Sequence, residues 1–166
     1  MWFTIAIMAW LSLASTLLGA VIGVGSAFII DRDRFSREQK VNTLEQRRIV
    51  YADYLSSLSR TRNELRLAAH RDALPLEERV KLAEEAFKEG QTYELRYKVS
   101  LLAPVPLVEA SDAAFRSLRR VRDVVAAGGV RGQADYIAAR DDWEDAFASL
   151  REKMRRDLGI NDQPDP

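Results

Sequence analysis

Residues 1–30 read MWFTIAIMAWLSLASTLLGAVIGVGSAFII and contain no Asp, Glu, Lys, Arg, His, Asn, Gln or Pro. The hydrocarbon core of a bilayer, about 30 Å thick, is crossed by roughly 20 apolar helical residues, so this stretch is long enough to span it. Inside lipid, a helix satisfies every backbone polar group within one segment. The sequence therefore predicts a single transmembrane helix over residues 1–30.

The main alternative for this stretch is a cleaved secretory signal peptide. Such a signal has a basic leader, a shorter apolar run and a small-x-small cleavage site. Here no basic residue precedes the apolar run, and the run ends in Phe28, Ile29 and Ile30. The membrane helix is therefore the preferred interpretation.

Basic residues follow the apolar stretch, and none precedes it. The flank richer in Lys and Arg stays in the cytoplasm. The basic residues of the C-terminal flank are Arg32, Arg34, Arg37, Lys40, Arg47 and Arg48. We therefore expect a protein of the cell (inner or plasma) membrane, with its N-terminus outside and its C-terminal domain in the cytoplasm.

One face of the predicted membrane helix carries small residues at four-residue spacing. These residues are Ser15, Gly19, Gly23 and Ala27. A Gly-x-x-x-Gly pair lets two helices approach closely and gain packing in lipid, although Gly and Ser are common in membrane helices generally. The stripe is a hypothesis for a helix–helix interface, so the predicted partners include membrane lipid and a second copy of the chain.

The rest of the chain is long enough for one domain with a modest core. The 166 residues include 25 Lys and Arg and 25 Asp and Glu, so no bulk charge attracts the chain to nucleic acid. There is no Cys, which excludes disulfides, thiolate metal sites and cysteine nucleophiles. We expect a helical linker beside the membrane at 31–43, a helical bundle domain at 44–159 and a disordered tail at 160–166.

Four amphipathic stretches make up the expected bundle domain. Apolar residues at three- and four-residue spacing predict helices over residues 44–72, 75–102, 107–127 and 134–158. Pro75, Pro104 and the pair Gly128 and Gly129 separate them. Short connections favour an antiparallel arrangement. The predicted fold class is all-α, with one N-terminal transmembrane helix followed by an antiparallel bundle of about four helices.

The same spacing predicts which side chains are buried. On the first helix of the bundle they include Leu44, Tyr51, Leu58 and Leu65. On the second they are Val80, Ala83, Phe87, Gly90, Tyr97 and Leu101, and on the fourth they include Trp143 and Phe147. Glu94 interrupts the second stripe, and residues 93–99 alternate apolar and polar as in a strand. Because no second strand is present to pair with them, we predict a helix there.

No motif for catalysis, metal binding or cofactor binding accompanies these helices. His70 is the only histidine, and neither G-x-S-x-G nor a pair of Glu-x-x-His motifs occurs. There is also no P-loop and no G-x-G-x-x-G. We expect His70 to lie exposed near a helix end. We therefore expect no catalytic, cofactor-binding or metal-binding residue, no cofactor and no enzymatic activity.

The densest basic cluster beyond the membrane flank consists of Arg116, Arg119, Arg120 and Arg122. Such a cluster can bind lipid headgroups or nucleic acid. Acidic residues of the last helix offer partners within the bundle instead, and these are Asp141, Asp142, Glu144 and Asp145. We expect pairing within the bundle, and the sequence leaves open whether the cluster binds anything outside the chain.

Three short segments carry a resemblance to other proteins. They are residues 46–55 (QRRIVYADYL), residues 99–104 (VSLLAP) and residues 155–159 (RRDLG). In these segments the chain resembles uncharacterised single-pass helical membrane proteins of Arg-rich bacteria and their phages. The shared residues serve packing and capping, so the resemblance implies the helical architecture and no activity.

Two functions are consistent with this organisation. The first is a single-pass membrane-anchored interaction or scaffold protein that binds an unknown cytoplasmic protein or oligomerises, and an apolar face left uncovered on the bundle would support it. The alternative is a phage- or stress-related membrane effector that acts through assembly of its transmembrane helix. Growth arrest on expression of residues 1–40 alone would distinguish the effector from the interaction protein.

Overall fold

The computed structural model describes residues 41–71 and 73–160. Within these ranges every regular element is a helix and none is a strand, which confirms the all-α prediction. Outside them lie the predicted transmembrane helix, most of the predicted linker, residues 161–166, and the predicted site residues Ser15, Gly19, Gly23, Ala27, Arg32, Arg34, Arg37 and Lys40. In the part of the chain that is described, no helix combines the length and the apolar composition that crossing a membrane requires.

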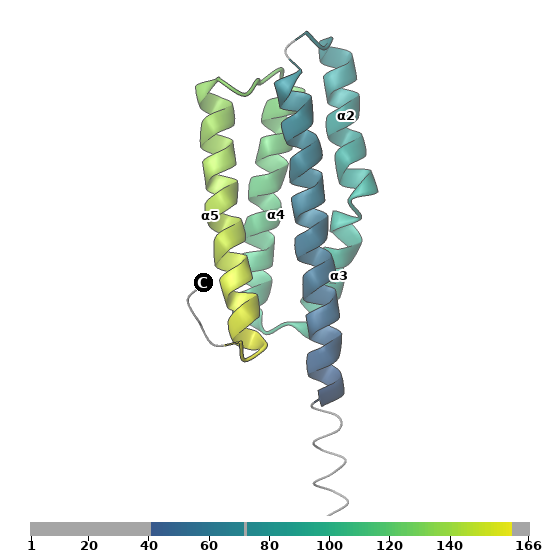
Figure 1. Cartoon of the computed structure of the whole chain (residues 1–166), viewed down its shortest axis with the longest axis vertical. Helices are drawn as coiled ribbons and strands as arrows, with labels where there is room; N and C mark the ends of the chain where they lie inside the picture. The colour runs from purple at the N-terminus through teal and green to yellow at the C-terminus, as the bar shows by residue number, and fades with distance from the viewer. Residues whose placement is uncertain (1–40, 72, 161–166) are drawn as a thin grey trace, which may run out of the picture. The chain divides into compact units, whose positions relative to one another are not determined.

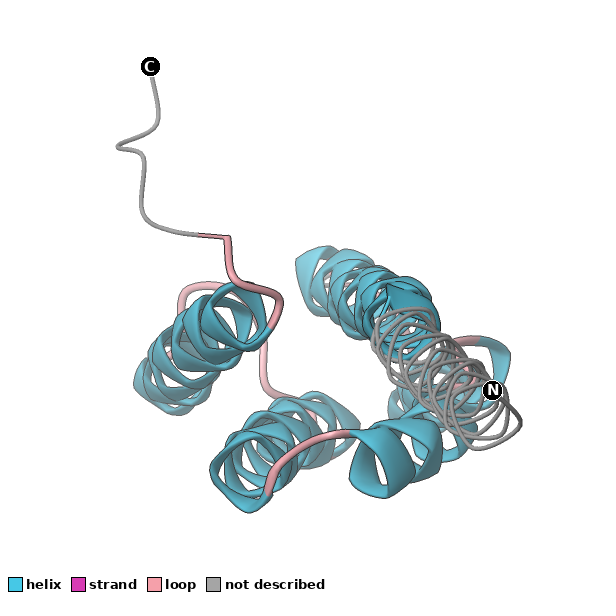
Figure 2. Cartoon of the chain, turned by 90° about the horizontal axis from the view of Figure 1, so that it is seen from below, coloured by secondary structure: helices cyan, strands magenta, loops and turns pink. Residues whose placement is uncertain are grey.

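The described helices form one compact unit from Leu44 onward. A leading helix covers residues 41–70 and is followed by α2 (Leu76–Glu89), α3 (Thr92–Leu102), α4 (Val105–Ala126) and α5 (Ala134–Asp157). In Figure 1 the leading helix, the α2–α3 pair, α4 and α5 lie side by side, and successive members run in opposite directions. Seen end-on in Figure 2, they surround a common centre. The bundle is therefore antiparallel.

The core contains most of the stripe predicted for the leading helix, and on α5 Trp143 is buried while Phe147 is partly buried against the core. Tyr51, Leu58 and Leu65 are buried on the leading helix, as predicted. Leu44 is the exception, with 43% of its surface exposed. The reason is that Arg47 already pairs with Asp157 at the last residue of α5. Leu44, one turn before Arg47, therefore lies beyond the last residue of α5.

The second predicted helix, 75–102, is broken in two. The break lies at Gly90 and Gln91, and Gln91 has a left-handed backbone with φ of 53°. Before the break Ala83 and Phe87 are buried, and after it Leu95 and Val99 are buried. After the break, the positions that are buried are therefore shifted along the sequence by about two residues from those that an unbroken helix would bury. Residues 93–99 are helical, so the choice of helix over strand is confirmed.

The rotation overturns part of the predicted core. Tyr97 and Leu101, expected inside, have 60% and 83% of their surface exposed. The prediction assumed one uninterrupted helical phase from residue 80 to residue 101, and the left-handed residue ends that phase. Glu94, the exception in the predicted stripe, is exposed beside Tyr97, in agreement with the rotated phase.

Hydroxyl groups of the leading helix form hydrogen bonds with residues on both sides of the break between α2 and α3. Ser57 Oγ donates to the carbonyl of Gly90 at 2.6 Å, and Thr61 Oγ1 donates to the carbonyl of Ala86 at 3.3 Å. Thr61 Oγ1 also lies 3.0 Å from Thr92 Oγ1. A helix end leaves carbonyl groups without partners inside the helix, and a buried one is costly if it stays unpaired. Ser57 therefore supplies a partner for the Gly90 carbonyl at the break. The Ala86 carbonyl also accepts from the backbone N–H of Gly90 at 3.1 Å, so the bond from Thr61 is an additional one.

Glycines follow the C-terminal ends of α4 and α5, and a buried arginine joins two of the connections between helices. Gly128 and Gly159 follow α4 and α5 with φ of 97° and 69°, the left-handed conformation expected after a helix. Arg79, only 3% exposed, donates to the carbonyls of Arg71 at 3.0 Å and Gly129 at 3.5 Å. It therefore ties the connection before α2 to the connection after α4.

Candidate functional site

An apolar stripe on α3 faces solvent instead of the core. Tyr93, Tyr97 and Leu101 follow one another at four-residue intervals, which places them on one helical face. Their exposed fractions are 39%, 60% and 83%, and Val105, at the start of α4, is 70% exposed. We refer to Tyr93, Tyr97 and Leu101 as the α3 patch. Adjoining exposed apolar side chains of this kind mark interaction surfaces more often than isolated ones do.

The buried rings of Phe87 and Phe115 pack against Tyr93 of the patch. The Tyr93 ring lies 4.9 Å from the Phe115 ring at an interplanar angle of 74° and 6.2 Å from the Phe87 ring. Phe87 and Phe115 are themselves 6.1 Å apart and nearly perpendicular. Edge-to-face contacts add stabilisation to the burial of aromatic rings. The position of Tyr93 is therefore fixed before any partner binds.

An arginine fixes the next residue of the patch. The guanidinium carbon of Arg96 lies 5.3 Å from the centre of the Tyr97 ring and 4.6 Å from that of Phe115, distances typical of cation–π contacts. Its Nη1 donates to Asp112 Oδ1 at 3.1 Å. Glu94 and Lys98 are exposed beside the patch on the same helix. The rim of the patch consequently contains two acids, Glu94 and Asp112, and two bases, Arg96 and Lys98.

A second polar cluster joins the leading helix to the end of α5. Asp157, whose side chain is 14% exposed, accepts hydrogen bonds from Arg47 Nη1 at 3.2 Å and from Tyr51 Oη at 2.8 Å. Burial, and then the hydrogen bond to Asp157, raise the pKa of Tyr51. Burial also raises the pKa of Tyr54 to about 12. Both phenols are therefore held in the neutral form within the fold.

These two tyrosines predict that the bundle loses stability in alkali. An unfolded tyrosine ionises near pH 10, whereas Tyr51 and Tyr54 stay protonated in the folded state. Above about pH 10 the unfolded state therefore binds fewer protons, and the free energy of unfolding falls as the pH rises. Below that pH the contribution is complete. Urea unfolding at pH values between 7 and 11, followed by circular dichroism, measures this decrease in the free energy of unfolding.

Substitution by phenylalanine tests which tyrosines cause the loss of stability at high pH. Tyr51→Phe/Tyr54→Phe is expected to flatten the difference between pH 7 and pH 11, because neither side chain can ionise. Tyr97→Phe is the matched control, since Tyr97 is exposed and should leave the difference unchanged. A pH profile that is the same in the double variant and in the unsubstituted chain would contradict the assignment.

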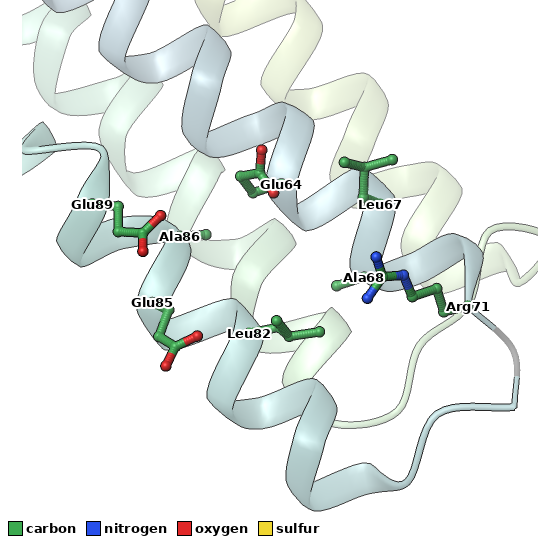
Figure 3. Close-up of a pocket in the computed structure, with 8 residues that line it drawn as sticks. All are labelled: Glu64, Leu67, Ala68, Arg71, Leu82, Glu85, Ala86 and Glu89. Carbon is green, nitrogen blue, oxygen red and sulfur yellow. The ribbon is translucent and has the colours of Figure 1, made fainter.

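A small groove lies between the leading helix and α2 (Figure 3). It has a volume of about 90 Å³ and an apolar floor, with Glu64 on one side and Glu85 and Glu89 on the other. Lys81 Nζ lies 3.9 Å from Glu85. Across residues 41–71 and 73–160, no three His, Cys, Asp or Glu side chains are grouped so that they could hold a metal ion.

His70 lies where the sequence predicts it. It is exposed at the last residue of the leading helix, and its Nδ1 is 2.7 Å from the carbonyl oxygen of Arg66 one turn earlier. No side chain beyond its own helix contacts it through a hydrogen bond or an ion pair in the described structure. Its role is local to the end of the helix.

The arginine cluster of α4 forms only part of the predicted pairing. Arg120 pairs with Asp142 on α5 at 2.8 Å, as expected. Arg122 instead pairs with Asp123 on its own helix and lies over the Phe87 ring at 5.1 Å. Arg116 and Arg119 are exposed and have no ion-pair partner among the described residues. Glu144 of α5 pairs with Arg62 on the leading helix at 3.0 Å instead of with the arginine cluster of α4.

The α3 patch is the feature that sequence reasoning misplaced. Tyr97 and Leu101 were expected in the core because they continue the spacing of α2, and Tyr93 was not part of the predicted stripe. Two signals pointed to the break: Glu94 within the apolar stripe, and the alternation over residues 93–99. No protein-family model, no curated protein and no solved structure matches the chain. Its function therefore has to be inferred from its own residues.

Proposed function

We propose that the protein is a single-pass membrane-anchored interaction protein. Residues 1–30 would hold it in the cell membrane, and the helical bundle would bind another protein molecule in the cytoplasm through the α3 patch. The observation that carries this proposal is the exposure of Tyr93, Tyr97 and Leu101 on one face of α3. An apolar face left uncovered is what an interaction protein requires and what a self-contained bundle avoids.

The chemistry of the patch supports binding. Tyr and Arg are enriched among the residues that carry most of the energy of protein interfaces, and both are present here. Phe115 supports Tyr93, and Arg96 is fixed between Tyr97 and Asp112. Side chains that are already ordered lose less entropy on binding than free ones. The patch is therefore preorganised for contact.

The anchor and its orientation are tested by fusions at the C-terminus. Because six basic residues follow the apolar stretch and none precedes it, the bundle should stay in the cytoplasm. An alkaline phosphatase fusion is expected to be inactive and a fluorescent-protein fusion bright. Deleting residues 1–30 should move the fluorescent fusion from the membrane pellet to the supernatant. The reverse activity pattern, or a deletion variant that stays in the pellet, would contradict the anchor as proposed.

The docking surface is tested by photo-crosslinking in native membranes. A photoreactive amino acid in place of Leu101, which is 83% exposed on α3, should yield a defined protein adduct. The matched control is the same substitution at Ile137, which is 37% exposed on α5. No adduct at position 101, or equal adducts at both positions, would overturn the α3 patch as the binding surface.

A further inference from the structure

We propose that the partner of the α3 patch is the α3 patch of a second copy of this chain, anchored in the same membrane. This inference rests on the proposed function, because it assumes that the patch is a docking surface. It goes further by naming the occupant and the symmetry of the contact. Three features of the patch favour a second copy: its charge, its size and its place on the bundle.

The charges around the patch suit contact with itself. In a two-fold contact the same surface lies on both sides, so a rim of one sign would repel its copy. The rim here has Glu94 and Asp112 as acids and Arg96 and Lys98 as bases. Arg96 and Asp112 already pair with each other within one copy, so the rim is balanced in charge and does not repel its own copy. A strongly charged partner, including an anionic lipid surface, would gain little from a balanced rim.

The size of the patch favours a partner that is already on the membrane. A stable interface between free proteins covers about 800 Å² on each side, and three side chains on one helix provide a smaller surface. Joining two binding partners through a common support raises their effective concentration and makes a weak contact sufficient. Every copy of this chain carries the apolar stretch of residues 1–30, so each copy would bring its own anchor.

The location of the patch suits a symmetric contact. Thr92 is the first residue of α3, and its Oγ1 lies 3.3 Å from Ser57 Oγ on the leading helix. From Thr92, α3 runs towards the end of the bundle where the leading helix begins (Figure 1). Two identical copies inserted in the same membrane in the same orientation can be related by a two-fold axis perpendicular to that membrane. Like residues then meet, with Tyr97 opposite Tyr97 across an axis perpendicular to the membrane.

Cysteine cross-linking of the full-length chain in native membranes tests the contact. The chain contains no Cys, so any disulfide-linked dimer must form through an introduced residue. Ser100→Cys places a thiol beside Leu101 with a minimal change of shape, and Ser149→Cys places one on α5, at another exposed serine. On mild oxidation, the dimer formed by Ser100→Cys is expected to exceed that formed by Ser149→Cys about tenfold, because membrane tethering raises the local concentration equally for both variants and only the α3 contact brings residue 100 of two copies together.

A second variant tests the patch itself. Leu101→Glu in the Ser100→Cys background is expected to reduce the dimer about tenfold, because the apolar contact is replaced by two like charges. The bundle should stay folded, since Leu101 is 83% exposed, and circular dichroism checks this. Equal cross-linking at positions 100 and 149, or a dimer that Leu101→Glu does not reduce, would overturn the proposal.

The photo-crosslinked adduct at position 101 separates this inference from the proposed function. An adduct of twice the mass of the chain supports the second copy. An adduct of another protein mass retains the interaction protein but overturns the second copy as its partner. A lipid adduct, or none, overturns both the second copy and the protein-binding role of the patch.

Discussion

Replacing Trp143 by alanine is expected to lower the free energy of unfolding by about 3–5 kcal/mol, the usual cost of truncating a buried tryptophan. Trp143 is 6% exposed, and its ring stacks on Phe147 at 4.9 Å and 17°. The guanidinium of Arg62, on the leading helix, lies 5.5 Å from its centre. A domain of this size is held by about 5–15 kcal/mol, so the substitution removes a large share of that stability.

Urea unfolding of the full-length chain in mild detergent, followed by circular dichroism, measures this loss. Ile137→Ala on the same helix is the control, because Ile137 is 37% exposed and its truncation should cost far less. Trp143→Phe should also cost less, since the indole Nε1 is buried without a hydrogen-bond partner and no bond is broken. A midpoint for Trp143→Ala equal to that of the unsubstituted chain would contradict the packing of α5.

Replacing Gly90 by alanine is the second substitution expected to have a large effect, with a loss of about 1–3 kcal/mol from overpacking. A Cβ at this position would lie 2.1 Å from Thr61 Oγ1 and 3.0 Å from both Ala86 O and Thr92 Oγ1. The backbone itself accepts alanine, since φ of Gly90 is −66°. In an ordinary helix the change would stabilise by up to about 1 kcal/mol. The clash with Thr61 therefore decides the sign.

A double-mutant cycle with Thr61→Ala isolates that clash. Removing Oγ1 clears the nearest atom, so Gly90→Ala should cost less in the Thr61→Ala background, with a coupling of about 0.5–3 kcal/mol. Gly132→Ala is the control, because a Cβ there meets nothing within 4 Å, and it should change stability by less than about 0.5 kcal/mol. Additive losses at positions 61 and 90 would contradict the proposed contact at the break.

The position of this break explains why the spacing of apolar residues misplaced Tyr97 and Leu101. Helical spacing is a local signal, and it predicted the burial of Tyr51, Leu58 and Leu65. The pair Gly128 and Gly129 likewise predicted the end of α4. At Gly90 and Gln91 the local signal is weak, because Gly disfavours a helix by only about 1 kcal/mol relative to Ala and Gln favours one. The break depends on Ser57 and Thr61, whose hydroxyls bond to the carbonyls of Gly90 and Ala86. Those partners lie on another helix.

The sequence by itself determined the all-α class, the boundaries of most helices and the apolar stretch on which the predicted anchor rests. These features depend on residues close together in the chain. Tertiary structure alone decided that Tyr97 and Leu101 face solvent, that Arg79 is buried and that Asp157 joins Arg47 to Tyr51. Each of these outcomes depends on hydrogen bonds or packing between segments far apart in the chain. Such contacts arise only once the helices have been placed side by side.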